Sequence, residues 1–175
     1  VHFFHPVRVN SRYGLTGKIT VEDGVMFGFN GGARWLGPIG IEIRTSHAEV
    51  VIGRGATIMR NTRLVCFERI SIGQECTIGD GCLLVDSNVH DFRPGAWHKP
   101  VRGKPIELAA RVHVGPDSTV LQGVRIGADT VIGNRSVVQT RLPARCVAMG
   151  NPAKVILLYP PDDGISLAKP SSNSE

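Results

Sequence analysis

Aliphatic residues recur at every sixth position through the middle of this 175-residue chain. From Ile52 the units are IGRGAT, IMRNTR and LVCFER, and after the step Ile70-Ser71 they are IGQECT, IGDGCL and LVDSNV. The period resumes at Val114 with VGPDST, VLQGVR, IGADTV, IGNRSV, VQTRLP and then ARCVAM. Glycine often follows the aliphatic residue, and the fifth place is usually small, as at Ala56 and Cys76. A regular period of this kind indicates a repeat architecture.

Each hexapeptide predicts one short strand followed by a corner, so three units close one turn of a three-sided coil. The aliphatic side chain points inward and fills the prism, and the small residue lies near the corner, where space is short. Like positions stack on the next turn about 4.8 Å away, with the strands paired in parallel. One turn cannot bury its own faces, so several are required. The predicted fold class is therefore all-β, a parallel β-helix built from hexapeptide repeats.

The repeat predicts one domain over residues 1–158, although the period is weaker before Ile52. Residues 91–108 break it and are predicted to form a long loop excursion after the coil that ends at His90. A loop of this length in a compact repeat is more often functional than idle. Residues 159–175 are rich in Pro and Ser and lack the period, which predicts an extended or disordered tail.

Composition agrees with many short strands and corners, because the chain holds 21 Gly and 11 Pro and is 42% hydrophobic. No run is apolar enough to span a membrane. The net charge of +5 suits a phosphate-rich small ligand, whereas scattered Lys and Arg without interleaved aromatic residues argue against nucleic acid. The four cysteines form no CxxC pair, so no metal is predicted. Buried reduced thiols and the absence of a secretory signal favour a cytoplasmic protein.

Three segments resemble the hexapeptide-repeat acyltransferases: IGDGCLLVDSNVHDF, the stretch from GKPIELAARVHVGPDS to IGNRSVV, and AMGNPAKVI. The resemblance is greatest to the maltose and galactoside O-acetyltransferases and to the sugar acetyltransferases of surface-polysaccharide pathways. It implies a left-handed β-helix, a homotrimer with sites shared between subunits, and transfer of an acetyl group from acetyl-CoA to a hydroxyl or amine of a sugar. It also implies direct attack on the thioester, without an acyl-enzyme.

His90 matches the family's catalytic histidine, and imidazole suits a general base near neutral pH. Asp86 and Asn88 flank it in DSNVH, where either could orient the imidazole, bind acceptor hydroxyls or simply form a turn. Asn61 matches an asparagine that the family often carries near the acceptor. Trp97 could stack on a sugar face or pin the loop.

The resemblance also places the acetyl-CoA site. The matching positions are Gly115, Pro116, Gly133, Asn134, Gln139, Thr140, Arg141 and Lys154. Lys154 is the expected partner of a CoA phosphate. His113 replaces the family's tryptophan, and Pro116 has no N–H to offer the thioester oxygen, so a neighbour would have to supply an oxyanion donor.

Other functions stay open at this point. Xenobiotic acetyltransferases that modify antibiotics have similar coils and also use a loop histidine. A noncatalytic β-helix that serves as a scaffold or binding module would not explain His90 and the GNPAK ending together. The carbonic anhydrase branch of the fold needs three histidine ligands, and the six histidines here show no such cluster. Nothing in DFRPGAWHKPVRGKP identifies the acceptor.

Overall fold

A computed structural model describes residues 1–4, 6–11, 16–28, 37–99 and 101–160. The described strands form three sheets, called A, B and C. Sheet A contains, in spatial order, β1 (His2–Phe3), β4 (Met26–Phe27), β7 (Thr57–Ile58), β10 (Thr77–Ile78), β13 (His113–Val114), β16 (Val131–Ile132), β18 (Cys146–Met149) and β19 (Lys154–Leu158). Sheet B contains β17 (Val137–Val138), β14 (Thr119–Val120), β11 (Leu83–Val85), β8 (Arg63–Cys66), β5 (Ile39–Ile43) and β2 (Val7–Ser11). Sheet C contains β15 (Arg125–Ile126), β12 (Ile106–Leu108), β9 (Arg69–Ile72), β6 (Glu49–Ile52) and β3 (Lys18–Val21).

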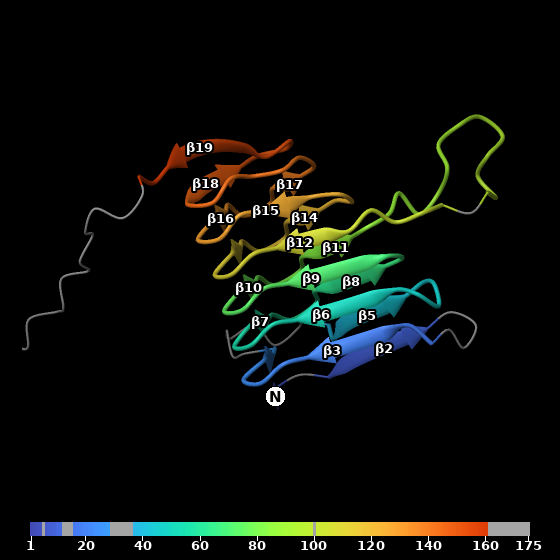
Figure 1. Cartoon of the computed structure of the whole chain (residues 1–175), viewed down its shortest axis with the longest axis horizontal. Helices are drawn as coiled ribbons and strands as arrows, with labels where there is room; N and C mark the ends of the chain where they lie inside the picture. Colours follow the sequence, from blue (N-terminus) through green and yellow to red (C-terminus); the bar gives the residue numbers. More distant parts are fainter. Residues whose placement is uncertain (5, 12–15, 29–36, 100, 161–175) are drawn as a thin grey trace, which may run out of the picture.

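The chain passes from sheet A to sheet B to sheet C and then begins the next turn, so the strands stack as the rungs of a prism (Figure 1). Val114 lies beside Ile132, eighteen residues later, which is the length of three hexapeptides. Ile58 instead lies beside Ile78, twenty residues later, because the two-residue step falls within that turn. The predicted parallel pairing of repeats is therefore confirmed.

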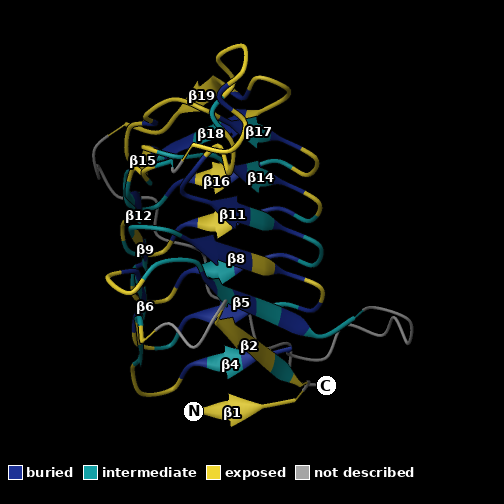
Figure 2. Cartoon of the chain, turned by 90° about the vertical axis from the view of Figure 1, so that its right-hand side faces the viewer, coloured by how far each residue is buried: buried dark blue, intermediate teal, exposed yellow. Residues whose placement is uncertain are grey.

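The aliphatic residues that open the hexapeptides form the hydrophobic core of the prism. Buried segments, dark blue in Figure 2, recur on successive turns. Ile52, Ile58, Leu64, Ile78 and Leu84 in the earlier coils, and Val114, Val120, Ile132 and Val138 in the later ones, are all at most 1% exposed. Burying each such side chain contributes about 1.5–3 kcal/mol relative to leaving it in water. Stacking identical positions on successive turns thus turns the sequence period directly into a continuous core.

The small residues at the fifth place lie inside the corners, as predicted. Where they carry a hydroxyl group, the hydroxyl donates to a nearby carbonyl: Thr62 Oγ1 to Gly79 O at 2.8 Å and Thr130 Oγ1 to Pro143 O at 2.9 Å. A buried hydroxyl without such a partner would be costly. Small polar residues are therefore compatible with the core because the corners bring carbonyl groups within reach.

The structure differs from the expectations at two places. The predicted loop 91–108 is three residues too long, because Ile106–Leu108 form β12 and pair with β9 and β15. At the other end of the helix, β19 turns back and pairs antiparallel with β18, so the last strand leaves the parallel pattern. Most of the predicted tail, residues 161–175, lies outside the described residues. No helix long and apolar enough to cross a membrane occurs in the described ranges.

Candidate functional site

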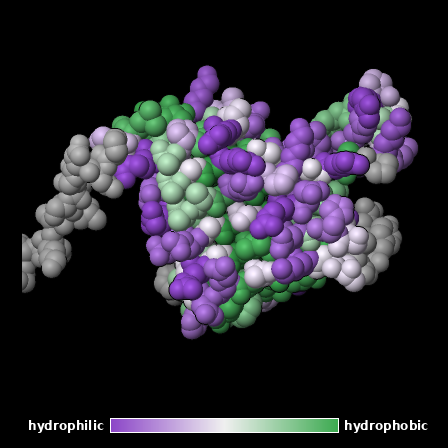
Figure 3. Space-filling view, in the orientation of Figure 1, coloured by the Kyte–Doolittle hydropathy of each residue, from purple (hydrophilic) through white to green (hydrophobic). Residues whose placement is uncertain are grey.

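A long excursion leaves the prism after β11, where sheet B would pass directly to sheet C, and projects well beyond the coils (Figure 1). The two ends of this loop meet, because the Lys104 N–H donates to Asp86 O at 2.6 Å. The following turn of the coil also binds Lys104, because the Gly123 N–H donates to Lys104 O at 2.9 Å. The coil therefore resumes in register after the loop, and the loop stands on a fixed base. Its surface is largely hydrophilic (Figure 3).

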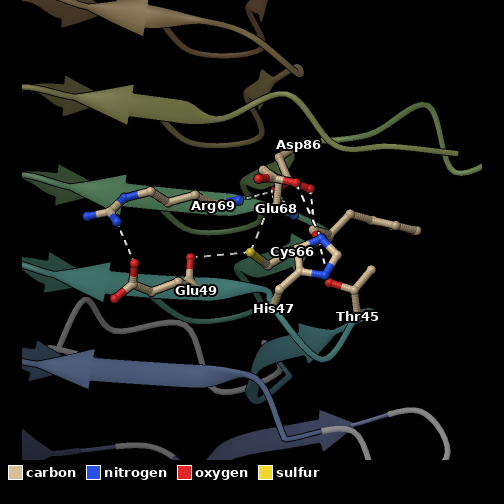
Figure 4. A network of polar contacts seen from close by, with 8 residues as sticks. Thr45, His47, Glu49, Cys66, Glu68, Arg69 and Asp86 are labelled. Carbon is tan, nitrogen blue, oxygen red and sulfur yellow. Dashed lines mark hydrogen bonds and ion pairs between the residues drawn. The ribbon is translucent and has the colours of Figure 1, made fainter.

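Asp86 anchors this base from inside the molecule. Its side chain is fully buried and accepts hydrogen bonds from three successive main-chain N–H groups one turn earlier, at Phe67, Glu68 and Arg69, with lengths of 2.7, 2.7 and 2.8 Å (Figure 4). Burial raises the pKa of the Asp86 carboxyl, while these N–H groups act in the opposite direction. The carboxylate oxygens are thus occupied by the corner that precedes β9. The structure gives them no bond to the imidazole of His90, in contrast to one of the roles predicted from the sequence.

His90 is exposed at the start of the loop. Its Nδ1 lies 3.5 Å from the main-chain oxygen of Trp97, and the two rings are tilted with their centroids 5.9 Å apart. The preceding residue, Val89, has a φ of 65°, which is rare for a β-branched side chain and costs energy. The Val89 N–H donates to Ser87 Oγ at 3.1 Å, which helps to hold this backbone. The strained turn directs His90 away from the coil and toward the loop.

A cavity of about 680 Å³ lies between the loop and the coil, and it is lined by His90 together with Asn88, Gln122 and Lys104. Gln122 Nε2 donates to Asn88 Oδ1 at 2.5 Å. Asn88 and His90 therefore line the same cavity. Gln122 was missed by the sequence analysis, although it occupies the third place of VLQGVR just as Asp86 does in LVDSNV. One turn of the coil places these two positions side by side, because Leu84 pairs with Val120.

Part of the predicted donor site lies on a different edge of the prism, between sheets A and B. Gly115 follows β13, and Gly133 and Asn134 follow β16, so these residues stack on successive turns. A Cβ on Gly115 would lie 2.5 Å from Asn134 Oδ1 and 2.8 Å from its main-chain nitrogen. Gly115 therefore lets the next turn approach closely. Pro116 lies beside it and accepts a hydrogen bond from the Arg135 N–H at 2.9 Å.

Asn61 also lies on the edge between sheets A and B, since it follows β7 and precedes β8. His90 follows β11 and lies on the edge between sheets B and C. Within one chain the two residues are thus on opposite sides of sheet B. Asn61 has a φ of 56°, and its N–H donates to Gly37 O at 3.0 Å.

The remaining donor residues lie elsewhere on the surface. Gln139, Thr140 and Arg141 follow β17 and are exposed on the edge between sheets B and C, the same edge as His90. Arg141 lines a groove of about 690 Å³ on the face of sheet C, together with Arg125 and Glu107. Lys154 is the first residue of β19 and is exposed. The candidate residues of a single chain are therefore divided between two edges and the end of the helix.

The cysteines are unsuited to nucleophilic chemistry. All four are buried and unpaired. Burial raises the pKa of the Cys66 thiol to about 12 and that of Cys82 to about 11, and in Cys66 the nearby Asp86 charge adds to the effect. A thiol that stays protonated is a weak nucleophile. Across the described ranges, no three His, Cys, Asp or Glu side chains are grouped so that they could hold a metal ion.

Comparison with known proteins relates this architecture to a class of enzymes. No family model matches the chain. It is 32% identical over 108 residues to the putative colanic acid biosynthesis acetyltransferase WcaF of Escherichia coli K12, covering 62% of this chain and 58% of that protein. It is 33% identical over 116 residues to the polysialic acid O-acetyltransferase of E. coli O1:K1/APEC, covering 65% and 38%.

Among solved structures, the hexapeptide-repeat acetyltransferase VCA0836 of Vibrio cholerae O1 biovar eltor, complexed with acetyl-CoA, matches with a TM-score of 0.63. The identity is 23%, and the match covers 77% of this chain and 70% of that one. The chain has the fold of the hexapeptide-repeat acetyltransferases. The predicted left-handed β-helix and its resemblance to sugar acetyltransferases are thereby confirmed. The chain spans 35% to 58% of the length of the curated acetyltransferases that it matches over more than 100 residues.

Proposed function

We propose that the protein is an acetyltransferase that moves the acetyl group of acetyl-CoA to a hydroxyl or amine of a sugar, with His90 as the general base. The observation that carries the proposal is the position of His90 at a polar cavity beside an excursion of a hexapeptide-repeat β-helix. The relatives named for colanic acid biosynthesis and for polysialic acid support a carbohydrate acceptor.

The geometry of His90 suits proton abstraction. If Nδ1 carries the hydrogen and faces the carbonyl of Trp97, Nε2 has a free lone pair for the acceptor. Nε2 then takes the proton of the acceptor hydroxyl while its oxygen attacks the thioester carbon. The bond from carbon to sulfur breaks, and the proton passes from Nε2 to the departing CoA thiolate. A base of this kind contributes about 10²- to 10⁴-fold to the rate.

The donor would lie along Gly115, Pro116, Gly133 and Asn134, with Lys154 at a phosphate, and Gln139, Thr140 and Arg141 would approach it from the edge that holds His90. In one chain the first group of residues and His90 occupy two edges of the prism. A threefold homotrimer brings unlike edges of neighbouring subunits together, so each site would combine His90 of one chain with the A–B edge of the next. The separation of Asn61 from His90 supports this shared site, and a cytoplasmic location stays a prediction.

The direct test is release of the CoA thiol from acetyl-CoA in the presence of free sugars, nucleotide-linked sugars and antibiotics. We expect acceptor-dependent release that His90→Ala lowers about 10²- to 10⁴-fold, with acetyl-CoA affinity retained. His98→Ala is the matched control, because His98 is exposed in the same loop and does not line the cavity. A His90→Ala variant that turns over at the wild-type rate would exclude the proposed base. Release of the CoA thiol with antibiotics but with none of the sugars would show that the acceptor is an antibiotic instead of a sugar.

A further inference from the structure

The cavity beside His90 carries positive charge that the described residues do not balance. Three cationic side chains line it, Arg93, Arg102 and Lys104, and they face a single acidic one, Asp91. Asp91 is already paired with Arg93, whose Nε donates to its two carboxylate oxygens at 2.9 and 3.1 Å. Arg102 and Lys104 form no ion pair with any residue that the structure describes. With His90 neutral, the lining therefore has a net charge of +2.

Several cations on the faces of sheets B and C are balanced by an acid. On sheet C, Glu49 pairs with Arg69 and Glu107 with Arg125, each pair joining directly opposite positions on neighbouring strands. On sheet B, Glu42 lies 2.5 Å from Arg63. At these three positions the preceding turn supplies an acid for the cation. Arg102 and Lys104 have no such partner, and both line the cavity where the repeat is interrupted and His90 is exposed.

Lys104 is held in place at this point. Its main-chain N–H and carbonyl are both bonded to neighbouring turns, through Asp86 and Gly123. Gly123 has a φ of 74°, and a Cβ built there would lie 3.5 Å from Lys104 Cβ and 3.6 Å from its Cδ. The carbon stem of Lys104 therefore runs along the corner formed by Gly123, next to Gln122. The start of this side chain is fixed although its ammonium group reaches solvent.

We infer that the acceptor is an anionic saccharide, whose carboxylate or phosphate binds Arg102 and Lys104 while one of its hydroxyls reaches His90. Arg and Lys are the side chains best suited to such groups, since their hydrogen bonds to an anion are charge-assisted. Asn88 and Gln122, joined to each other at 2.5 Å, offer polar atoms on the same cavity wall for neutral hydroxyls. The inference rests on the proposed function, because it names the class of acceptor for the same site.

The experiment measures binding of three probes to the full chain by calorimetry: methyl galactoside, methyl galacturonide and UDP-galactose. The first two differ in one carboxylate, and the third carries its charge on a diphosphate. We expect at least one anionic probe to bind about tenfold more tightly than methyl galactoside, and added salt to weaken it. Lys104→Gln should lower the affinity for that probe about tenfold and leave the affinity for methyl galactoside unchanged. Because the fixed contacts of Lys104 are made by its main chain, this variant should fold normally.

Lys99→Gln is the matched control, because it removes the same charge from the same loop at a residue outside the cavity lining. Equal affinity for all three probes would overturn the inference. So would a Lys104→Gln variant that loses acetyl-CoA affinity instead, since the charge would then serve the phosphates of the donor. If anionic probes bind selectively but no acceptor releases CoA, the proposed function fails and the anion site stands. If neutral sugars are acetylated with no preference for charge, the proposed function stands and the inference fails.

Discussion

Replacing Asp86 should destabilise the protein strongly without removing a group from the chemistry. The carboxylate is fully buried and accepts three main-chain hydrogen bonds of 2.7–2.8 Å from the corner at residues 67–69. A hydrogen bond to a charged group contributes about 1.5–3 kcal/mol, and an N–H left without a partner costs its desolvation. Water can reach part of this half-exposed corner and recover some of that cost. We therefore expect Asp86→Ala to lower the free energy of unfolding by about 3–5 kcal/mol.

Asp86→Asn should lower the free energy of unfolding less, by about 1–3 kcal/mol, because the amide oxygen still accepts hydrogen bonds, whereas its NH₂ group would face main-chain N–H donors. Urea unfolding at one fixed protein concentration measures these differences, since subunit association would make the midpoint depend on concentration. Asp23→Ala is the control, because Asp23 is exposed and its side chain forms no hydrogen bond or ion pair with a described residue.

Activity must be measured on the same samples, below the temperature at which the variants unfold. If Asp86 anchors the loop, the folded fraction of Asp86→Asn should have a pH profile like that of the wild type. An unfolding free energy within 1 kcal/mol of wild type for Asp86→Ala would refute the anchoring argument. If the Asp86 variants keep the stability of the wild type but lose turnover and show a shifted pH profile, Asp86 would instead act by orienting the imidazole of His90.

Three further outcomes are expected. Lys154→Ala should weaken acetyl-CoA binding by about 1.5–3 kcal/mol in calorimetry, and unchanged affinity would remove Lys154 from the donor site. His90→Ala and Asn61→Gly chains, each inactive alone, should regain about a quarter of wild-type activity when they are refolded together in equal amounts, because a quarter of the shared sites then contain both residues. Glycine is chosen because it keeps the positive φ of Asn61. No gain in activity over the two parent variants would mean that the site does not span subunits. Native protein should expose no thiol to a disulfide reagent at pH 8 and four after denaturation, and four reactive thiols in the native state would contradict their burial. The unfolding midpoint should also fall as the pH rises from 9 toward 12, because the pKa of Cys66 is about 12 in the folded protein against an ordinary 9.0.

The site could be predicted only in part from the sequence, and the physical reason is the distance over which its contacts form. His90, Asn88 and the break in the repeat are adjacent in the chain, so the motif around His90 identifies them. Asp86 binds main-chain groups seventeen to nineteen residues earlier, and Gln122 binds Asn88 across 34 residues that include the loop. An eighteen-residue turn would have placed Asp86 above Glu68, but nothing local shows that its carboxylate points inward.

What the sequence determined by itself is the β-helix and its core. A hexapeptide period decides which residues point inward whatever the partner strands are, because each strand pairs with its own repeat one turn away. The edge on which each corner lies was decided by the tertiary structure, because it depends on counting three sides through the step at Ile70-Ser71 and the loop. The same holds for charge. Glu107 balances Arg125 because the register sets them opposite. Lys104 meets only main-chain groups of the turns on either side, and Arg102 lies in the loop, so neither finds an acidic partner among the described residues at the cavity beside His90.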